Sequence, residues 1–547
     1  MADTTTPTAD NRLTVLDCTL RDGGYYNRWD FAPDLAQAYL AAMGASGIDV
    51  VEIGFRFTAT DSFYGPYAYT TDETIAALDF PSHVVPGVMC NAKDLLTFDG
   101  GGAKAVDHLF ADARNSPVAM VRIAAHLREV PECGPALMRL REKGYRVGLN
   151  MMQANGLPPA ELAKLAETVS GWDAVEVLYF ADSLGNMERQ DVAAIMDALK
   201  AAWDGPLGLH AHENMGRALD NSLAAIDAGA AWIDGTVLGM GRGAGNVRIE
   251  YLLLELVRRG QAGRKPDSVL RLVSDYFEPL RAKHGWGSNQ YYYLSGIYGI
   301  HPTYVQQMLS DDRYGGDEIF AVLQSLAEEG GGSYSQEGLE AAVARSFRDA
   351  TGGWSAEGWA EGSDVLLIAA GPSLENHCDA ILRYIERAKP KTICLNLTDL
   401  IPPTAVDLYA ACHPTRMLSQ LDRFRETGRP VALPVGAMPE SARAHLDGID
   451  VHDFGMKVAP GEFQTAATGC TVPAPLVAAY AMAVAGASGA KRVLLAGFDG
   501  YAADDPRHAE MNRIFDLARH AMPDTSIVAM TPTTYTVERS SIYAPAP

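Results

Sequence analysis

The chain has no uninterrupted run of about 18 apolar residues, the length that a membrane-spanning helix requires. A transmembrane protein is therefore not expected. Residues Met1–Asn11 are polar, acidic and rich in threonine, and they lack the basic and apolar regions of a secretory signal peptide. The sequence accordingly predicts a cytoplasmic location.

Positive charge is also scarce. The 547 residues include 45 Lys and Arg against 68 Asp and Glu, so the formal net charge is -23 at pH 7. A protein that binds nucleic acid or an anionic membrane needs a basic surface to displace counterions. Neither partner is expected, whereas an anionic small substrate needs only one local positive site.

Cysteine is sparse as well, with 7 residues and no CxxC pair. An odd, scattered set predicts reduced thiols rather than a disulfide framework, and we interpret these thiols as small core residues. The hydrophobic fraction of 48% is ample for packed cores. A chain of this length is expected to form more than one domain.

Short apolar runs alternate with helical patterns over the first 250 or so residues. The runs predict eight strands: Leu13–Leu16, Val50–Ile53, His83–Met89, Ala119–Ile123, Tyr145–Leu149, Ala174–Tyr179, Pro206–Leu209 and Ala231–Val237. This alternation predicts an α/β fold, a (β/α)8 TIM barrel, with an open doubly wound sheet as the alternative. The barrel is favoured because the polar residues fall at the strands' carboxyl ends, where barrels place their sites.

Two further parts follow the barrel. We predict a barrel domain over residues 1–265, a helical extension or lid over 266–355, and a Rossmann-like open α/β domain over 356–547. The last part has these strand candidates: Asp364–Ala370, Thr392–Leu397, Ala405–Ala411, Pro430–Pro434, Lys491–Phe498 and Ser526–Met530. Its expected helices include Glu375–Ala388 and Pro475–Ala487.

The clearest chemical signal lies in two distant segments, Leu16–Gly24 and Gly208–Asn214. His210 and His212 are two apart, so they project from the same face of a strand. We expect Asp22 to end the first strand and to converge with them. A carboxylate and two imidazoles form a ligand set for a divalent metal, and Arg21 adds a fixed positive charge beside it. Together, a metal and an arginine can hold an enolate.

Two neighbouring positions extend this prediction. Asn246 lies in a glycine-rich turn after the last strand, and its carbonyl is a candidate fourth ligand. The alternative is that the asparagine only shapes the turn. Glu52 is expected to end the second strand and to pair with Arg21, fixing its orientation. The alternative is a barrel-interior salt bridge without a role in chemistry.

These residues resemble a known family. The match rests on Arg21, Asp22, Glu52, His210 and His212, with Thr19–Gly23, Ala181–Gly185 and Gly243–Asn246 as further support. The segment from about residue 13 to 255 resembles the DRE-TIM metallolyases, and most of all the 4-hydroxy-2-oxovalerate aldolases. The resemblance implies that a divalent metal chelates a 2-oxo acid such as pyruvate while Arg21 binds the enolate oxygen. It also implies substrate contacts from Asp182 and Ser183, and a homo-oligomer.

The ligand set suits Mn2+ or Mg2+ best, and Co2+ and Zn2+ also fit it. One position departs from the family pattern, because Tyr25 stands where the aldolases carry a histidine base. A phenol with a pKa of about 10 is a weak base at neutral pH. Either Tyr25 binds substrate while another group takes the proton, or the acceptor aldehyde differs. His301 is a candidate base, and the alternative is a histidine that only begins a helix.

The last part of the chain carries a weaker signal. Gly371 and Ser373 stand at a strand-to-helix turn, where a glycine lets a ligand approach and a helix N-terminus favours anions. A tight turn without function is the alternative. With Asp499, these residues loosely resemble a domain of bacterial sialyltransferase-like and motility-accessory-factor proteins. That resemblance implies a pocket for a nucleotide sugar or a phosphosugar near Gly371, Ser373 and Asp499.

The sequence therefore predicts a divalent-metal-dependent aldolase that joins or separates pyruvate and an aldehyde. The aldehyde would be sugar-derived, in the synthesis of a surface glycan or an unusual sugar. Claisen condensation with an acyl-CoA is the enzymatic alternative. A non-catalytic sugar-binding protein built on a relic barrel is the other alternative.

Overall fold

The computed structural model describes residues 13–58, 62–311, 314–345, 347, 349–413, 420–438, 443–502 and 505–544. The chain forms two compact units. The first comprises Met1–Ser310 with Glu329–Tyr334, and the second comprises Asp311–Glu328 with Ser335–Pro547. Each unit has its own core and is described by itself.

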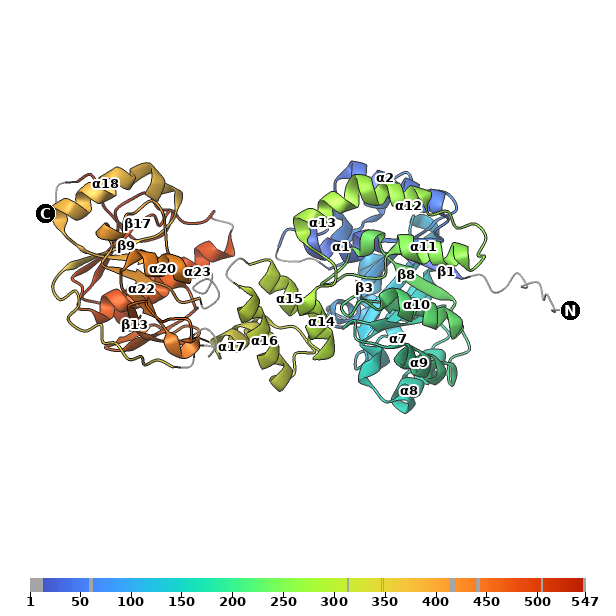
Figure 1. Cartoon of the computed structure of the whole chain (residues 1–547). Helices are drawn as coiled ribbons and strands as arrows, with labels where there is room; N and C mark the ends of the chain where they lie inside the picture. Colours follow the sequence, from blue (N-terminus) through green and yellow to red (C-terminus); the bar gives the residue numbers. More distant parts are fainter. Residues whose placement is uncertain are drawn as a thin grey trace. The chain divides into compact units, whose positions relative to one another are not determined.

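The first unit is a closed barrel of eight parallel strands, which confirms the predicted (β/α)8 fold (Figure 1). The strands follow the barrel in chain order: β1 Thr14–Asp17, β2 Val50–Phe55, β3 Val85–Asn91, β4 Met120–His126, β5 Arg146–Met152, β6 Val177–Asp182, β7 Leu207–Ala211 and β8 Trp232–Gly235. β1 closes the ring by pairing with both β2 and β8. Each predicted apolar run overlaps one of these strands, and most of the strands end a few residues beyond the run.

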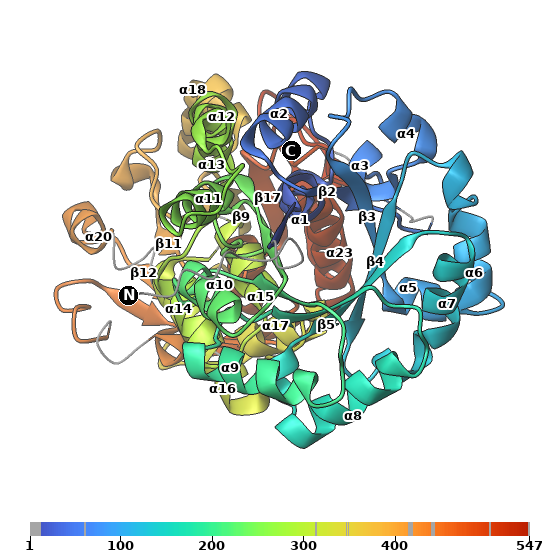
Figure 2. The same cartoon turned by 90° about the vertical axis from the view of Figure 1, so that its right-hand side faces the viewer.

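Helices surround the barrel strands. They are α1 Thr19–Asn27, α2 Pro33–Ser46, α3 Pro66–Tyr69, α4 Asp72–Ala76, α5 Ala92–Leu96, α6 Gly102–Leu109, α7 Gly134–Glu142, α8 Pro159–Ser170, α9 Arg189–Lys200, α10 Ala218–Asp227 and α11 Ile249–Arg258. Figure 2 shows α6, α7 and α8 outside strands β4 and β5. The strands are thus covered from outside, while Leu16, Met120 and Tyr179 fill the barrel interior.

The predicted helical segment contains no β-strand among its described residues. Its helices are α12 Asp267–Leu272, α13 Glu278–His284, α14 Gln290–Ile297, α15 Pro302–Leu309, α16 Gly316–Glu329 and α17 Gln336–Ala344. A π-helical turn, Val273–Phe277, joins α12 to α13. α12 to α15 belong to the first unit, whereas α17 and nearly all of α16 belong to the second.

The second unit is built on an eight-stranded parallel sheet, which confirms the predicted open α/β architecture. The strand order is β13 (Val451–Asp453), β12 (Val431–Leu433), β11 (Leu408–Ala410), β10 (Lys391–Leu395), β9 (Asp364–Ile368), β17 (Arg492–Ala496), β18 (Ser526–Ala529) and β19 (Glu538–Arg539). The direction of winding reverses between β9 and β17, and open sheets of this kind bind ligands at such a switch point.

The two faces of this sheet are both buried. Val365 and Leu367 pack into one core, and Leu366 and Ile368 into the other. Among the described residues of this unit, the α-helices other than α16 and α17 are α18 Pro372–Ala388, α20 Leu421–Thr427, α22 Val477–Ala487 and α23 Pro506–Ala521. Burial on both faces explains why the central strands are continuous apolar runs in the sequence.

The second unit also has a small side sheet that the sequence did not predict. Its order is β14 (Gly455–Val458), β16 (Gly469–Val472) and β15 (Gln464–Ala466), with β15 antiparallel to β16. Among the described residues of both units, none of the helices has the length and apolarity needed to cross a membrane.

Candidate metal and catalytic site

Asp22, His210 and His212 lie together at the carboxyl ends of β1 and β7. One ligand atom from each residue lies within 4.8 Å of the other two. His210 Nε2 is 3.8 Å from Asp22 Oδ2. All three side chains are buried, with at most 4% of each residue exposed. The arrangement can hold one cation between a carboxylate and two imidazoles.

The protonation states of these groups suit a cation. Burial lowers the pKa of His212 well below its ordinary value, and His210 adds to this effect. Burial alone would raise the pKa of Asp22, but Arg21 and the two histidines outweigh it and lower that pKa. His212 is therefore a neutral imidazole and Asp22 a carboxylate at neutral pH, the forms that bind metals.

Two buried side-chain atoms of the candidate metal ligands have no hydrogen-bond partner among the residues that the structure describes. They are His212 Nδ1 and Asn246 Oδ1. The backbones of these residues form a β-bridge, and Asn246 Nδ2 donates a hydrogen bond to Asp22 Oδ2. An unsatisfied polar atom at this depth is costly, and a bound cation would relieve that cost. The residues present therefore fit a divalent cation.

Two sequence expectations about position were wrong. Asp22 does not end the first strand, because the strand stops at Asp17 and Asp22 lies in the first turns of α1. The backbone N–H and hydroxyl of Thr19 both donate to Asp17 Oδ1, which turns the chain into that helix. Glu52 does not end β2 either, because the strand continues through a register shift between Glu52 and Gly54 and ends at Phe55.

Arg21 is anchored by two carboxylates. Its Nε donates to Glu52 Oε1 at 2.7 Å, and its Nη1 donates to Asp22 Oδ1 at 2.8 Å. The predicted pairing of Glu52 with Arg21 is thus present. Arg21 Nη2 is buried without a partner among the described residues. The Nη2 amino group of a fixed guanidinium is therefore left to bind an anionic oxygen.

Two further residues, which the sequence did not reveal, complete this network. Arg122 on β4 donates from Nε to Glu52 Oε2 at 2.6 Å and from Nη1 to Asp234 Oδ2 at 2.8 Å. Asp234 on β8 also lies 3.0 Å from His210 Nδ1. A carboxylate only accepts hydrogen bonds, so this nitrogen donates and Nε2 is the one that faces Asp22. The contacts therefore form a closed ring of side chains. It runs from Asp22 through Arg21, Glu52, Arg122, Asp234 and His210 and returns to Asp22.

Tyr25 and Arg242 border the site. Tyr25 lies on α1 beside Trp29 and Phe55, and 37% of the residue is exposed, but the protein around its hydroxyl still desolvates that group and raises its pKa above the ordinary value. The Arg242 guanidinium lies 6.0 Å from the Tyr25 ring centroid. Tyr25 therefore keeps its proton at neutral pH. This protonation state favours a role for Tyr25 as a proton donor and not as a general base.

His301 is the N-cap of α15, where its Nδ1 accepts a hydrogen bond from the Thr303 backbone N–H at 3.3 Å. Burial lowers its pKa to about 2, and Arg242 and His126 contribute. The ring is therefore neutral and only weakly basic at physiological pH. This geometry matches the alternative that His301 only begins a helix. A catalytic role for His301 remains a prediction.

Asp182 and Ser183 shape the loop after β6. Asp182 accepts from the backbone N–H groups of Asn186 and Met187, at 2.9 Å for Asn186. Ser183 Oγ accepts from the Gln153 N–H at 3.1 Å, and the Ser183 carbonyl accepts from Arg242. Burial raises the pKa of Asp182 to about 7. Substrate contact by Asp182 and Ser183 remains a prediction.

Gly371, Ser373 and Asp499 converge in the second unit, at the β9–β17 switch point. Asp499 accepts from the Ser373 N–H at 3.0 Å and from the Ser373 hydroxyl at 2.7 Å. A Cβ on Gly371 would lie 2.2 Å from Asp499 Oδ2. The Asp499 carboxylate thus lies at the N-terminus of α18, where a phosphate would otherwise be expected.

The first unit is a closed barrel of parallel strands, and its candidate metal ligands lie at the carboxyl ends of those strands. These two features together define a TIM-barrel enzyme. Comparison with known proteins gives the family. The chain belongs to the HMGL-like family, whose family model matches residues 12–273, and its barrel is a lyase of this kind. The resemblance to DRE-TIM metallolyases is thereby confirmed.

Several relatives are similar to this chain. The 4-hydroxy-2-oxovalerate aldolase of Carboxydothermus hydrogenoformans is 32% identical over 252 residues, which are 46% of this chain and 72% of that protein. The oxaloacetate decarboxylase of Mycobacterium tuberculosis is 29% identical over 330 residues, 58% of this chain and 92% of the relative. A crystal structure of the N-terminal domain of a protein described as an aldolase from Bacteroides vulgatus is 30% identical, with a TM-score of 0.51 over 56% of this chain and 99% of that one.

Proposed function

We propose that the barrel is a divalent-metal-dependent aldolase that makes or breaks a carbon–carbon bond between the enolate of pyruvate, or a similar 2-oxo acid, and an aldehyde. One observation carries the proposal. Asp22, His210 and His212 are buried with one ligand atom of each within 4.8 Å of the others, beside an arginine whose Nη2 amino group has no partner among the described residues. Relatives named as aldolases over this region support the same reading.

Asp22, His210 and His212 would hold the metal, and Asn246 is the fourth candidate through its buried Oδ1. When bound, a divalent cation supplies Lewis acidity that makes the 2-oxo acid easier to enolise. The combination of carboxylate, amide and imidazole ligands suits Mn2+ or Mg2+, with Co2+ and Zn2+ as further options.

The chain's own residues supply the remaining functions. Arg21, fixed by Glu52 and Asp22, donates its free N–H to the oxygen on which enolate charge develops. Tyr25 gives a proton to the new alkoxide when the bond forms and becomes a phenolate, and in cleavage it is this phenolate that takes the proton from the substrate hydroxyl. The raised pKa of Tyr25 suits the donor role, since a protonated phenol is the resting form.

The proposal includes a setting for this chemistry. The second unit would hold a nucleotide sugar near Gly371, Ser373 and Asp499, and the aldehyde would be derived from a sugar. The reaction would belong to the synthesis of an unusual or surface sugar in the cytoplasm. The enzyme would be a homo-oligomer. The switch point of the parallel sheet supports a ligand site there, because ligands of such sheets bind at that crevice.

Decarboxylation of oxaloacetate is the second candidate. The similarity to an oxaloacetate decarboxylase covers 58% of this chain, whereas the similarity to the aldolase of Carboxydothermus hydrogenoformans covers 46%. Loss of CO2 from oxaloacetate leaves the pyruvate enolate, so the same arginine and metal ligands serve both reactions. The two candidates differ only in the group that leaves.

Pyruvate release tests both. The purified chain, stripped of metal and then supplied with Mn2+, should release pyruvate from 4-hydroxy-2-oxopentanoate or from oxaloacetate. His210→Ala should lower release to the rate that Mn2+ gives without protein, and His520→Ala, which alters an exposed histidine, should not. Retained turnover in His210→Ala would overturn the proposal. Release of free thiol from acetyl-CoA would instead favour the Claisen alternative.

A further inference from the structure

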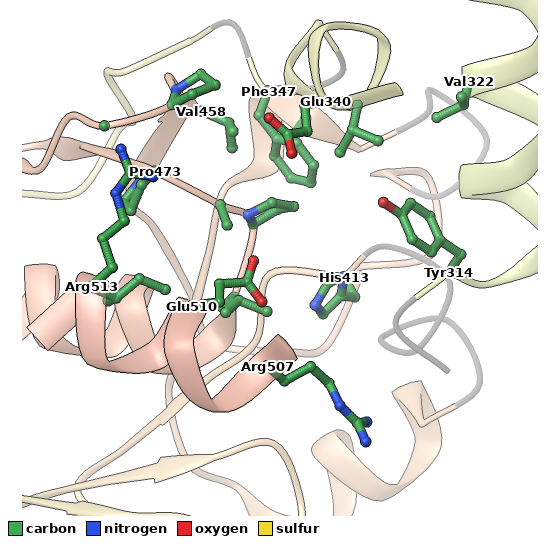
Figure 3. Close-up of a pocket in the computed structure, with 18 of the residues that line it drawn as sticks. Tyr314, Val322, Glu340, Phe347, His413, Val458, Pro473, Arg507, Glu510 and Arg513 are labelled. Atoms are coloured by element: carbon green, nitrogen blue, oxygen red, sulfur yellow. The ribbon is translucent and has the colours of Figure 1, made fainter. Parts of the chain in front are cut away.

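A cavity of about 700 Å3 in the second unit is large enough for a small organic ligand (Figure 3). Figure 3 shows the side chains of Glu340 and Glu510 on opposite sides of it. Neither carboxylate is an unsatisfied charge, because Glu340 is exposed and accepts from Gln336 at 3.2 Å, and Glu510 also interacts with another group. These carboxylates therefore do not select a ligand, whereas one charged residue of the barrel does.

That residue is Arg242, a half-buried cation without a carboxylate partner among the described residues. Its Nη2 donates to the Ser183 carbonyl at 3.3 Å, and its Nε is buried without a hydrogen-bond partner in the described part of the chain. Arg21 and Arg122 differ from it, since both are paired with Glu52. A buried N–H group without an acceptor is costly, so we expect an acceptor that comes from a bound ligand.

The backbone on both sides of Arg242 holds it beside the candidate metal ligands. A Cβ on Gly241 would lie 2.8 Å from Asp22 Oδ2, so the chain passes directly against that carboxylate. On the other side, the Gly243 carbonyl accepts a hydrogen bond from the Tyr26 hydroxyl at 2.6 Å. The start of the Arg242 side chain is therefore fixed next to the site.

The Arg242 guanidinium also lies beside Tyr25, at 6.0 Å from its ring centroid. Desolvation is the first cause of the raised pKa of Tyr25, and the charges of Arg242, Asp22 and Arg21 also act on its hydroxyl. The hydroxyl thus lies within range of both the Arg21–Asp22 pair and Arg242. In the proposed reaction the new alkoxide lies at Tyr25, so a substituent on the aldehyde carbon can reach Arg242.

The charge at Arg242 favours a substituent with one negative charge. A carboxylate brings one such charge and accepts hydrogen bonds from a guanidinium in good geometry. A phosphate group brings about −1.5 to −2 charges at pH 7, which one unpaired guanidinium would not balance. We propose that Arg242 binds a carboxylate on the aldehyde half of the substrate, so that the enzyme selects aldehydes with a carboxylate close to the carbonyl carbon.

This proposal rests on the proposed function, because it names the class of aldehyde for that reaction. A sugar-derived aldehyde meets the requirement when it comes from a sugar acid, which carries a carboxylate. The nucleotide-sugar site proposed near Gly371, Ser373 and Asp499 is unaffected, since it lies in the other unit. Arg242 would determine specificity, because it contacts a part of the substrate that does not react.

Two substrates that differ in one group test the proposal. Cleavage of 4-hydroxy-2-oxopentanedioate gives pyruvate and glyoxylate, whereas 4-hydroxy-2-oxopentanoate has a methyl group in place of the second carboxylate and gives pyruvate and acetaldehyde. With the Mn2+-loaded full chain, kcat/KM for pyruvate release should be at least about tenfold higher for the dicarboxylate.

Variants of Arg242 should change this preference. Arg242→Gln should lower kcat/KM for the dicarboxylate by about 10- to 100-fold and that for the monocarboxylate by less than about threefold. Arg242→Lys keeps the positive charge and should retain part of the preference. Arg248→Gln is the matched control, because it alters a half-buried arginine that donates to Tyr251, and it should retain the full preference.

Unreactive analogues separate this proposal from the aldolase chemistry. 2-Oxopentanedioate and 2-oxopentanoate differ by the same carboxylate, and both lack the 4-hydroxyl group that cleavage requires. Calorimetric titration of the Mn2+-loaded chain should show at least about tenfold tighter binding of 2-oxopentanedioate. Arg242→Gln should remove this difference while its Mn2+ content and circular dichroism spectrum stay those of the parent.

The contrary outcomes are distinct. If neither hydroxy acid is cleaved, the aldolase function fails, and the analogue pair still decides the role of Arg242. That role is overturned if the two hydroxy acids are cleaved equally well, if the two analogues bind equally, or if the preference persists in Arg242→Gln. An equal loss of affinity for both analogues in Arg242→Gln would also overturn it, because Arg242 would then only hold the Ser183 loop in place.

Discussion

Asp234 accepts a hydrogen bond from His210 Nδ1 at 3.0 Å, on the side of the imidazole away from Asp22. This contact fixes the tautomer and the orientation of the ring, so that Nε2 faces the predicted metal position. Asp234 is held in turn by Arg122, which also binds Glu52. The candidate ligand His210 is thereby tied to Arg21, which is anchored on the same glutamate.

Replacing Asp234 with Asn should weaken Mn2+ binding by about 10- to 100-fold, since the amide no longer holds His210 as a carboxylate does. Equilibrium dialysis against Mn2+ measures this loss. Asp204→Asn, which alters an exposed aspartate, is the matched control. Unchanged Mn2+ affinity in a folded Asp234→Asn protein would show that this contact does not orient the ligand.

Arg21→Lys should lower kcat for pyruvate release by about 10²- to 10³-fold while leaving the metal content intact. A lysine ammonium cannot contact Glu52, Asp22 and an enolate oxygen with the planar fork that arginine provides. Steady-state kinetics and metal analysis measure the two quantities. Arg141→Lys, at an exposed position, serves as control, and a kcat near that of the control would contradict the assigned role.

His301 should make stability depend on pH. Its pKa is about 2 in the fold and about 6.5 when unfolded, so below pH 6.5 the unfolded chain binds the extra proton. The free energy of unfolding therefore falls as the pH drops from 7 to 5, by at most about 2 kcal/mol from this group. His301→Asn keeps an N-cap but does not titrate, so urea unfolding at the two pH values should show a smaller loss. An equal loss in both proteins would argue against this burial.

Gly371→Ala should destabilise the second unit by about 1–3 kcal/mol. The new Cβ would lie 2.4 Å from the Gly497 carbonyl oxygen, a backbone atom that cannot rotate away. Gly353→Ala is the matched control, because its Cβ would meet its nearest neighbour at an ordinary 3.5 Å. Differential scanning calorimetry should show a lower transition temperature for Gly371→Ala only, and equal transitions would contradict the tight turn.

The barrel could be predicted because parallel strands are buried on both faces and read as continuous apolar runs. The side sheet could not, because its strands are short and some are poorly buried. β15, Gln464–Ala466, has two exposed residues of three. Such a segment carries neither an apolar run nor a regular alternation, and only its pairing with β16 makes it a strand.

The candidate ligands could be predicted because His210 and His212 are two positions apart, and side chains at that spacing project from the same face of a strand. Arg122 and Asp234 were missed because each is a lone charge in an apolar run, and they lie 112 residues apart in sequence. A charged residue inside a buried strand requires a buried partner of opposite charge. The presence of Arg122 and Asp234 within apolar runs was therefore a signal from which their pairing could have been predicted. The helical position of Asp22 depended on hydrogen bonds between Thr19 and Asp17 that no apolar pattern reveals.

Exchange of the pyruvate methyl protons in D2O tests the central claim most directly, because it reports enolate formation without knowledge of the aldehyde. The Mn2+-loaded chain should catalyse deuterium incorporation, followed by NMR. The rate should fall to background after chelation or in His210→Ala, and persist in His520→Ala. Exchange that is independent of metal and of His210 would contradict the account.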